Sequence, residues 1–225
     1  MDLSPTAQVV AQTEAALTEP TILVPGFNDD TPMLHPLVTF LTQEQLNPQP
    51  ISPQPSNGIV GIEVLAERLA AQIDARFAPE QPLNLFGFSM GGLICRTYVQ
   101  KLGGAARIRH LVTLATPHQG TWLAYLFNRP ACLQMRPGSA FLGDLNSDLS
   151  ALKQIRFTSL WTPLDLTILP ATSSQMKVGE TISIVSPFHR ALLFDRRVLR
   201  RIADILRQPV DRAADTVMNE EWEKR

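Results

Sequence analysis

The segment Gly87-Phe88-Ser89-Met90-Gly91 holds a serine with a glycine two positions away on each side. The apolar run 83–88 predicts a buried strand before the serine, and a helix is predicted from about Met90 to Leu102 after it. A sharp turn from strand to helix would expose the serine hydroxyl at the start of the helix, where developing negative charge is favoured. This context predicts that Ser89 is a nucleophile. The alternative is an ordinary glycine-rich turn.

A serine hydroxyl is a weak nucleophile, so it needs a histidine base and a carboxylate that orients the histidine. In chains with this serine turn the order is nucleophile, acid, histidine. Asp165 follows an expected strand at 157–161, and His189 follows the next expected strand at 181–185. We therefore expect Asp165 to orient His189, and His189 to take the proton of Ser89. An isolated aspartate after a strand is otherwise typical of a turn or helix cap.

A second histidine lies in the turn Thr116-Pro117-His118-Gln119-Gly120, after an expected strand at 108–115. Its local motif is strong, but it precedes Asp165 in the chain. The order of the three groups therefore favours His189 as the base. We expect His118 to shape the cleft or to bond the backbone of residues 121–155.

The negative charge that forms when a serine attacks a carbonyl needs hydrogen-bond donors already in place. Such donors are commonly the backbone N–H after the nucleophile and a second N–H after the first strand. These positions are Met90 and Phe27, where Phe27 follows the expected strand 21–24 and the turn Pro25-Gly26. The assignment rests on position alone, because neither residue needs a particular side chain.

Strands and helices alternate along the chain, which predicts right-handed βαβ units and a mainly parallel sheet of about six strands with helices on both faces. The proline-dense stretch 47–56 fits an extended segment at most. Functional residues in such sheets gather at the carboxyl ends of the strands. The clearest strands are expected at 21–24, 83–88, 108–115, 157–161 and 181–185, and the clearest helices at 33–44, 59–78, 90–102 and 190–207.

Four segments together resemble the small bacterial lipases and esterases of the α/β-hydrolase superfamily, including the class 2 lipase-like proteins. The resemblance covers roughly residues 21–207 and implies the α/β-hydrolase fold. One departure is Pro25-Gly26, where many relatives carry His-Gly; the missing proline N–H is no loss if Phe27 is the donor. The segments that carry the resemblance are Val24-Pro25-Gly26-Phe27, Gly87-Phe88-Ser89-Met90-Gly91-Gly92, Leu114-Ala115-Thr116-Pro117-His118-Gln119-Gly120 and Trp161-Thr162-Pro163-Leu164-Asp165.

The resemblance also implies a small cap over the site, formed by residues 121–155. This segment is mixed in pattern and rich in leucine and aromatic residues. Trp122, Leu126 and Phe127 are expected to bind the acyl chain of a substrate. The alternative is an insertion that packs at the periphery of the domain.

These observations favour a serine hydrolase that cleaves carboxylic esters through an acyl-enzyme, with no metal ion or organic cofactor. The expected substrate is a small-molecule or lipid ester. An acyltransferase is the nearest rival, because an alcohol other than water can intercept the same acyl-enzyme. A catalytically silent lipid-binding module is a second rival, although a binding role alone would not require Ser89, Asp165 and His189 together.

The length of 225 residues and the ordinary composition predict a single domain, with an N-terminal arm at 1–20 and a charged tail at 209–225. The net charge of −1 gives no field that would attract nucleic acid. The one basic cluster alternates with apolar residues, which predicts the solvated face of a helix. Its alternative is a transient contact with an anionic membrane surface. The cluster consists of Arg196, Arg197, Arg200 and Arg201.

Cys95 and Cys132 form neither a disulfide framework nor a metal-site spacing, and Cys95 is expected to pack in an apolar helix. The N-terminal residues lack the features of a signal peptide. The chain also has no apolar stretch of about 18 residues that could cross a bilayer. We therefore expect a cytoplasmic protein. The sequence does not predict the oligomeric state.

Overall fold

A computed structural model describes residues 19–208 of the chain. Its centre is a six-stranded sheet in the order β2-β1-β3-β4-β5-β6, in which every neighbouring pair is parallel. This confirms the predicted parallel sheet of about six strands. The strands are β1 (Pro20–Val24), β2 (Asn47–Pro50), β3 (Leu83–Phe88), β4 (Ile108–Leu114), β5 (Arg156–Trp161) and β6 (Glu180–Ser183).

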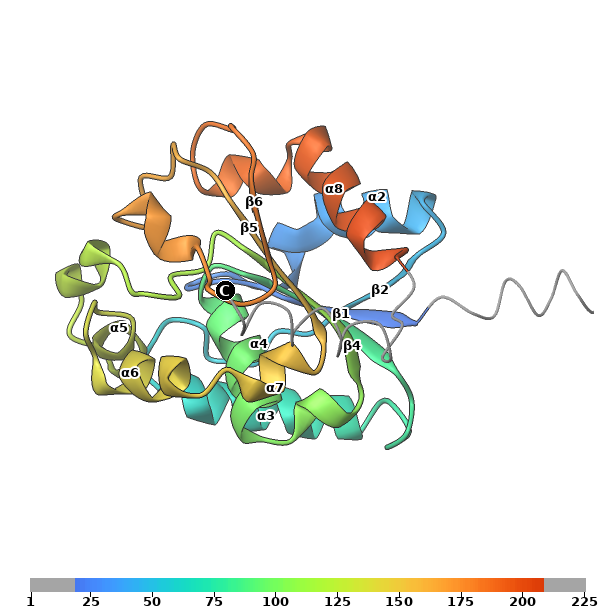
Figure 1. The fold of residues 1–225 in the computed structure, drawn as a ribbon, viewed down its shortest axis with the longest axis horizontal. Helices are drawn as coiled ribbons and strands as arrows, with labels where there is room; N and C mark the ends of the chain where they lie inside the picture. The colour runs from blue at the N-terminus through green and yellow to red at the C-terminus, as the bar shows by residue number, and fades with distance from the viewer. Residues whose placement is uncertain (1–18, 209–225) are drawn as a thin grey trace, which may run out of the picture.

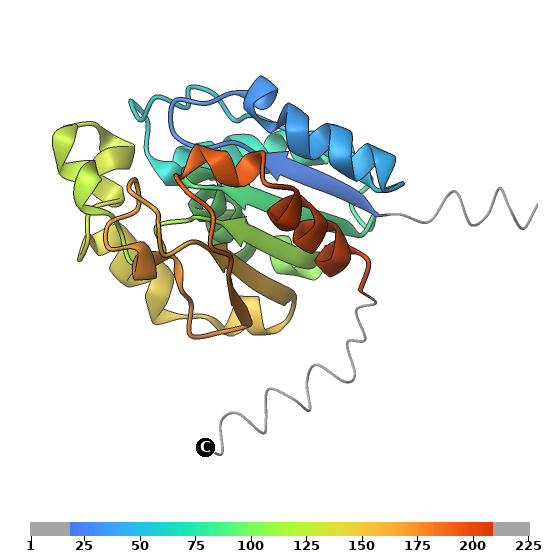
Figure 2. The same cartoon turned by 90° about the horizontal axis from the view of Figure 1, so that it is seen from above.

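Helices cover both faces of the sheet (Figure 1). On one face, α2 (His35–Gln43) and α8 (Arg196–Leu206) contact each other and the strands, as Figure 2 shows from above. The opposite face is covered by α3 (Ile62–Asp74) and α4 (Met90–Lys101). The central strand β3 is buried over its whole length, as expected of a parallel strand between two helical layers.

The edge strand β2 was expected only as an extended segment, because Pro48 and Pro50 cannot donate backbone hydrogen bonds. It pairs with β1 alone, so its prolines lie at the edge of the sheet where missing donors cost little. After β2, the Ile51 N–H donates to the Leu23 carbonyl at 3.0 Å and continues the pairing.

The C-terminal helix differs from its prediction. The expected helix 190–207 is divided into a short 3-10 helix η5 (Arg190–Leu193) and α8. Asp195 caps the start of α8, because its side chain accepts a hydrogen bond from the Arg197 N–H. The apolar residues of α8 are buried, whereas Arg196, Arg197 and Arg200 are exposed and Arg201 is half-buried. The predicted solvated arginine face is therefore confirmed.

The segment 121–155 has two parts. Its first part holds a 3-10 helix η3 (Trp122–Leu126) and α5 (Pro130–Gln134). Its second part holds α6 (Ala140–Ser147) and α7 (Ser150–Lys153), which contact α4 and add Leu142, Leu145 and Leu152 to the core beneath the sheet. The second part therefore follows the packing alternative instead of forming a cap.

The ends of the chain bring one correction. Pro20, which was expected in the N-terminal arm, is the first residue of β1 and pairs with Asn47. The rest of the expected arm, residues 1–18, and the expected tail 209–225 lie outside the described residues.

Cys95 and Cys132 are both buried and free, as a packing role requires, and burial raises the pKa of both thiols. Within residues 19–208, no helix is long and apolar enough to cross a membrane. No group of three or more potential metal ligands occurs in this same part of the chain.

Candidate active site

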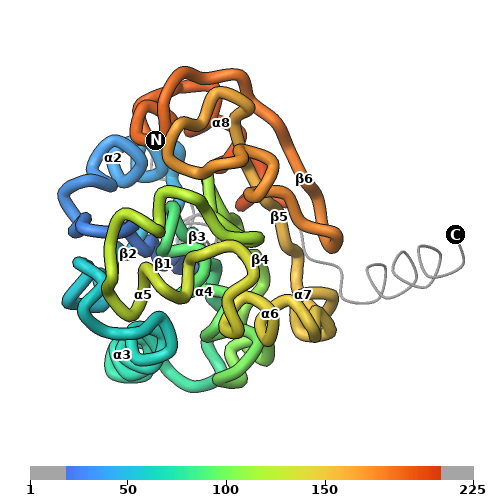
Figure 3. Tube along the Cα trace, turned by 90° about the vertical axis from the view of Figure 1, so that its left-hand side faces the viewer, coloured from blue at the N-terminus to red at the C-terminus, as the bar shows by residue number. Residues whose placement is uncertain are grey.

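The predicted site residues lie at one edge of the sheet, where the strands end. Phe27 follows β1, Ser89 follows β3, and Asp165 and His189 follow β5 and β6. Figure 3 looks onto this edge and shows the loops from distant parts of the chain lying side by side there. The parallel sheet brings them together because all six strands point the same way.

Ser89 is on a strained turn between β3 and α4, with φ 54° and ψ −124°. A positive φ is costly for a residue with a side chain, so the surrounding structure must hold this turn. The Ser89 N–H donates to the Leu114 carbonyl of β4 at 2.9 Å. On the other side, a Cβ at Gly91 would overlap the carbonyl oxygens of Val24 and Pro25. Glycine therefore lets the start of α4 lie directly against the end of β1.

Asp165 and His189 form a hydrogen-bonded pair. The Nδ1 atom of His189 lies 2.8 Å from Oδ2 of Asp165, and the two residues are 8% and 3% exposed. The other oxygen, Oδ1, accepts the N–H groups of Thr167 at 2.8 Å and Ile168 at 2.9 Å. Asp165 thus caps its own turn through one oxygen and bonds His189 through the other.

The His189 ring lies next to the serine turn. Its centroid is 4.8 Å from that of Phe88, the residue before Ser89. With Nδ1 bonded to Asp165, only Nε2 is left to accept a proton. No hydrogen bond joins Ser89 Oγ to His189 in the described structure; such bonds are often long before substrate is bound.

The expected oxyanion donors also lie at this edge. Among residues 19–208, neither the N–H of Phe27 nor that of Met90 donates a hydrogen bond to another residue. Two unpaired N–H groups near a serine, one of them in the first turn of a helix, can stabilise an oxyanion.

His118 lies apart from this pair. Its Nδ1 is 3.2 Å from Nη1 of Arg96 and its Nε2 is 3.0 Å from Oγ1 of Thr113, so both ring nitrogens have partners. Complete burial, and next the charge of Arg96, hold the pKa of His118 well below its usual range. Its carbonyl accepts from Nδ2 of Asn146 on α6 at 2.9 Å. The ring of His118 thus bonds two side chains and no backbone group of residues 121–155, while its carbonyl connects the turn to α6.

The residues expected to bind an acyl chain lie on the surface at the same edge. Trp122, Leu126 and Phe127 are 60%, 72% and 45% exposed. The ring of Phe127 lies 5.8 Å from that of Phe27, which connects η3 with the oxyanion loop. The structure thus brings Phe127 toward the site, while Trp122 stacks on Tyr125 at 5.5 Å.

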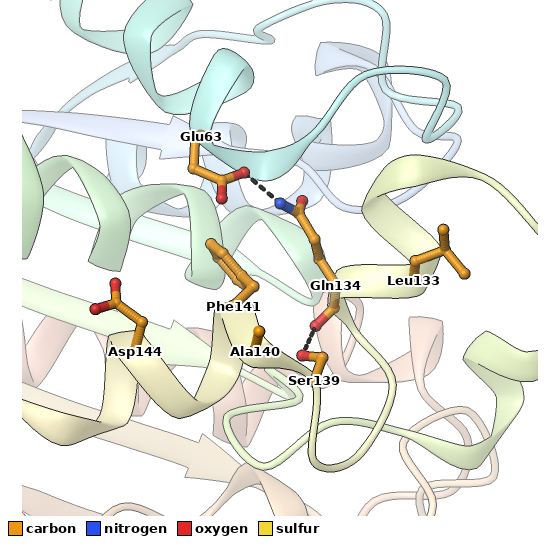
Figure 4. Close-up of a pocket in the computed structure, with 7 residues that line it drawn as sticks. All are labelled: Glu63, Leu133, Gln134, Ser139, Ala140, Phe141 and Asp144. Carbon is orange, nitrogen blue, oxygen red and sulfur yellow. Dashed lines mark hydrogen bonds between the residues drawn. The ribbon is translucent and has the colours of Figure 1, made fainter.

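A pocket of about 500 Å³ lies elsewhere, between α3 and the α5–α6 segment (Figure 4). Glu63 of α3 and Gln134 of α5 are hydrogen-bonded across it, and Gln134 also accepts from Ser139 through its carbonyl. None of the predicted catalytic residues lines this pocket. The pocket lies where α3 packs against α5, and α5 against α6, apart from Ser89, Asp165 and His189.

One charged residue at the site was not predicted. Asp29, in the loop after β1, is 8% exposed, and its Oδ1 accepts from Nη2 of Arg190 at 2.5 Å. Burial raises the pKa of Asp29, while the charges of Arg190 and His189 oppose that rise. The sequence feature that could have pointed to Asp29 is its position, two residues after the expected oxyanion donor Phe27.

The comparison with known families covers the serine turn. The model of the palmitoyl protein thioesterase family matches residues 42–125, which is less than half of the chain. The matched range includes Ser89 and His118 but neither Asp165 nor His189. No curated protein matches the chain.

Solved structures resemble the fold at low sequence identity. Lipase B of Aspergillus fumigatus has a TM-score of 0.70 at 16% identity, with 87% of this chain and 54% of that chain covered. The mature lipase BlEst2 of Bacillus licheniformis has a TM-score of 0.73 at 12% identity, with 84% and 92% covered. Phospholipase PlaB of Legionella pneumophila has a TM-score of 0.71 at 14% identity, with 92% and 63% covered.

The chain thus spans about half the length of the Aspergillus lipase and less than two thirds of PlaB. With the parallel sheet and the strained serine turn, these likenesses show that the chain has the α/β-hydrolase fold.

Proposed function

We propose that this protein is a serine hydrolase that cleaves esters of apolar acyl chains through an acyl-enzyme. The observation that carries the proposal is the buried Asp165–His189 hydrogen bond next to the strained turn of Ser89. A carboxylate that holds a histidine beside a serine is the arrangement that activates a weak hydroxyl nucleophile. The lipase-like fold and the partial thioesterase match support ester-type substrates.

In the proposed reaction, Ser89 Oγ attacks the acyl carbon while His189 Nε2 takes the hydroxyl proton. The N–H groups of Phe27 and Met90 donate to the oxyanion. When the tetrahedral intermediate collapses, the bond to the leaving oxygen breaks and His189 returns the proton to it. Water then attacks the acyl-enzyme with His189 again as base, releasing the carboxylic acid and restoring Ser89.

A thioester is the second candidate substrate, because the family match that includes Ser89 is to palmitoyl protein thioesterases. The same steps apply, with sulfur as the leaving atom. Parallel assays with butyryl and palmitoyl esters of p-nitrophenol and with palmitoyl-coenzyme A would rank the two classes. An acceptor alcohol added to the ester assay would reveal acyl transfer as a new ester product.

The apolar surface beside the site favours a substrate presented at a lipid surface. Residues 116–143 contain no aspartate or glutamate, and the exposed Trp122, Tyr125 and Leu126 lie in this range. Arg136 lies 4.7 Å from the ring centroid of Tyr125, so positive charge accompanies the aromatic surface. We therefore place the proposed membrane contact at η3 instead of at the arginines of α8. Phosphatidylglycerol vesicles should bind the protein more tightly than phosphatidylcholine vesicles; equal binding would contradict this placement.

The measurement that tests the proposal is labelling by a fluorophosphonate, followed by identification of the modified residue. Labelling of Ser89 together with turnover of p-nitrophenyl esters would support it. An unlabelled, folded protein without esterase or thioesterase activity would instead favour the catalytically silent lipid-binding module.

A further inference from the structure

Asp29 and Arg190 connect two loops that the proposed reaction uses. Asp29 lies two residues after Phe27, and Arg190 directly follows His189. The 2.5 Å contact between Oδ1 of Asp29 and Nη2 of Arg190 spans 161 positions of the chain. It therefore connects the loop that carries the expected oxyanion donor with the loop that carries the expected base.

The Asp29 carboxylate lies close to the nucleophile. A Cβ at Gly26 would be 3.0 Å from Cβ of Ser89 and 3.3 Å from Oδ2 of Asp29. A side chain at Gly26 would therefore contact both the serine and this carboxylate. A negative charge at this distance opposes an oxyanion that forms on the carbonyl bound to Ser89.

The two partners differ in exposure. The side chain of Asp29 is 6% exposed, whereas that of Arg190 is 55% exposed. An exposed ion pair contributes little to stability, but a buried carboxylate that loses its cation keeps an uncompensated charge. Removing Arg190 and removing Asp29 should therefore have unequal consequences.

The loop before Arg190 also needs to be held. Phe188 has φ +63°, an unfavourable backbone conformation for a bulky residue, immediately before His189. On the far side of His189, η5 is a single short turn. The contact with Asp29 connects this short segment to the loop after β1.

We propose that Asp29 and Arg190 are a positioning pair: their contact holds the Phe27 and His189 loops in register, and Arg190 neutralises a carboxylate that would otherwise oppose the oxyanion. The inference rests on the proposed serine hydrolase function. Neither residue is assigned a contact with substrate, and neither transfers a proton.

The test compares Arg190→Gln, Asp29→Asn and the double variant in the hydrolysis of p-nitrophenyl butyrate. Arg190→Gln leaves the carboxylate unneutralised, so kcat should fall by about 10-fold to 100-fold, with KM changed by less than about threefold. The double variant removes both charges, so its kcat should be at least about fivefold higher than that of Arg190→Gln, because the two positions are directly coupled. Arg190→Lys should retain more activity than Arg190→Gln, since it keeps the charge.

A pH profile separates electrostatic positioning from a merely structural role. Asp165 bonds His189 directly, Asp29 interacts with it electrostatically, and Arg190 bonds Asp29. An unneutralised Asp29 favours the charged imidazolium, so the acid limb of kcat/KM should move to higher pH by about half a unit or more in Arg190→Gln. In the double variant, the acid limb of kcat/KM should return to its wild-type position.

The matched control is the surface pair Arg201–Glu180, 3.1 Å apart, in which Glu180 is the first residue of β6 and thus lies at the end of the strands away from the site. Arg201→Gln should leave kcat and the pH profile unchanged. Equal losses in Arg190→Gln and the double variant, with an unmoved acid limb and a lowered melting temperature, would overturn the proposal in favour of a structural contact. Wild-type rates in all Asp29 and Arg190 variants would overturn it as well. Absence of Ser89 labelling in the wild-type protein would instead refute the proposed function.

Discussion

The imidazole of His189 donates through Nδ1 to a carboxylate oxygen of Asp165 at 2.8 Å, and both residues are buried. His118, in contrast, meets Arg96 and Thr113 through its two ring nitrogens and has no carboxylate partner among the described residues. The two histidines should therefore respond differently to substitution.

His189→Ala should lower kcat for p-nitrophenyl butyrate by several orders of magnitude, because it removes the imidazole that Asp165 holds beside the Ser89 turn. Labelling by the fluorophosphonate should slow in parallel. His118→Ala should lower activity modestly or mainly reduce stability. The reverse order, an inactive His118 variant and an active His189 variant, would contradict both the site and the role of Asp165.

Asp165→Asn should reduce kcat by about 10³-fold to 10⁴-fold, since an amide cannot stabilise the imidazolium that forms on His189. The fold should persist, because the amide oxygen can still accept the N–H groups that now bond Oδ1. Circular dichroism and thermal melting would check the fold. An Asp165→Asn variant with at least about a tenth of the wild-type kcat would show that the aspartate only caps its turn.

The stability of the protein should fall below about pH 6.5 because of His118. Its pKa is lowered in the folded protein, so the unfolded chain binds a proton that the folded state does not. The free energy of unfolding should therefore decrease as pH falls, by up to about 1.4 kcal/mol per pH unit for this one group.

His118→Gln should flatten this slope in urea unfolding between pH 7 and 5, whereas the exposed His35→Gln should leave the slope unchanged. A His118 variant whose stability falls as steeply with pH as that of the wild-type protein would show that other groups dominate the acid sensitivity.

Replacing Leu126 and Phe127 by serine should reduce kcat/KM more for palmitoyl than for acetyl esters. Each buried methylene of a substrate contributes about 0.8 kcal/mol only if an apolar wall meets it. Leu133→Ser is the matched control, because this exposed leucine lines the separate pocket on α3. A loss that is equal at every chain length would show that η3 does not bind the acyl chain.

The elements next to the serine could be predicted closely from sequence. The apolar run 83–88 is β3, and the helix expected from 90 to 102 is α4, which ends at Lys101. Both elements could be predicted because a buried parallel strand is apolar throughout and glycines mark its end. In β2, by contrast, Pro48 and Pro50 hide the strand, because an edge position tolerates residues that a central strand would exclude.

Contacts between distant segments could not be predicted in the same way. The bond between Asp29 and Arg190 joins residues 161 positions apart, and neither residue type indicates its partner. Likewise, the burial of Leu142 and Leu152 against α4 depends on the path that residues 140–155 take between β4 and β5. The spacing of apolar residues alone therefore could not distinguish helices that pack on the core from helices of a cap. The proximity of Asp165 and His189 could be predicted, because strand ends and chain order restrict which acid and which histidine can meet.

The most direct measurement is Ser89→Ala, assayed for fluorophosphonate labelling by mass spectrometry and for hydrolysis of p-nitrophenyl butyrate, with the fold checked by thermal melting. We expect a single modification on the Ser89 peptide of the wild-type protein, and loss of both labelling and turnover in a folded variant. Activity of Ser89→Ala within about tenfold of the wild-type rate, or labelling at another residue, would contradict the central claim that Ser89 is the nucleophile.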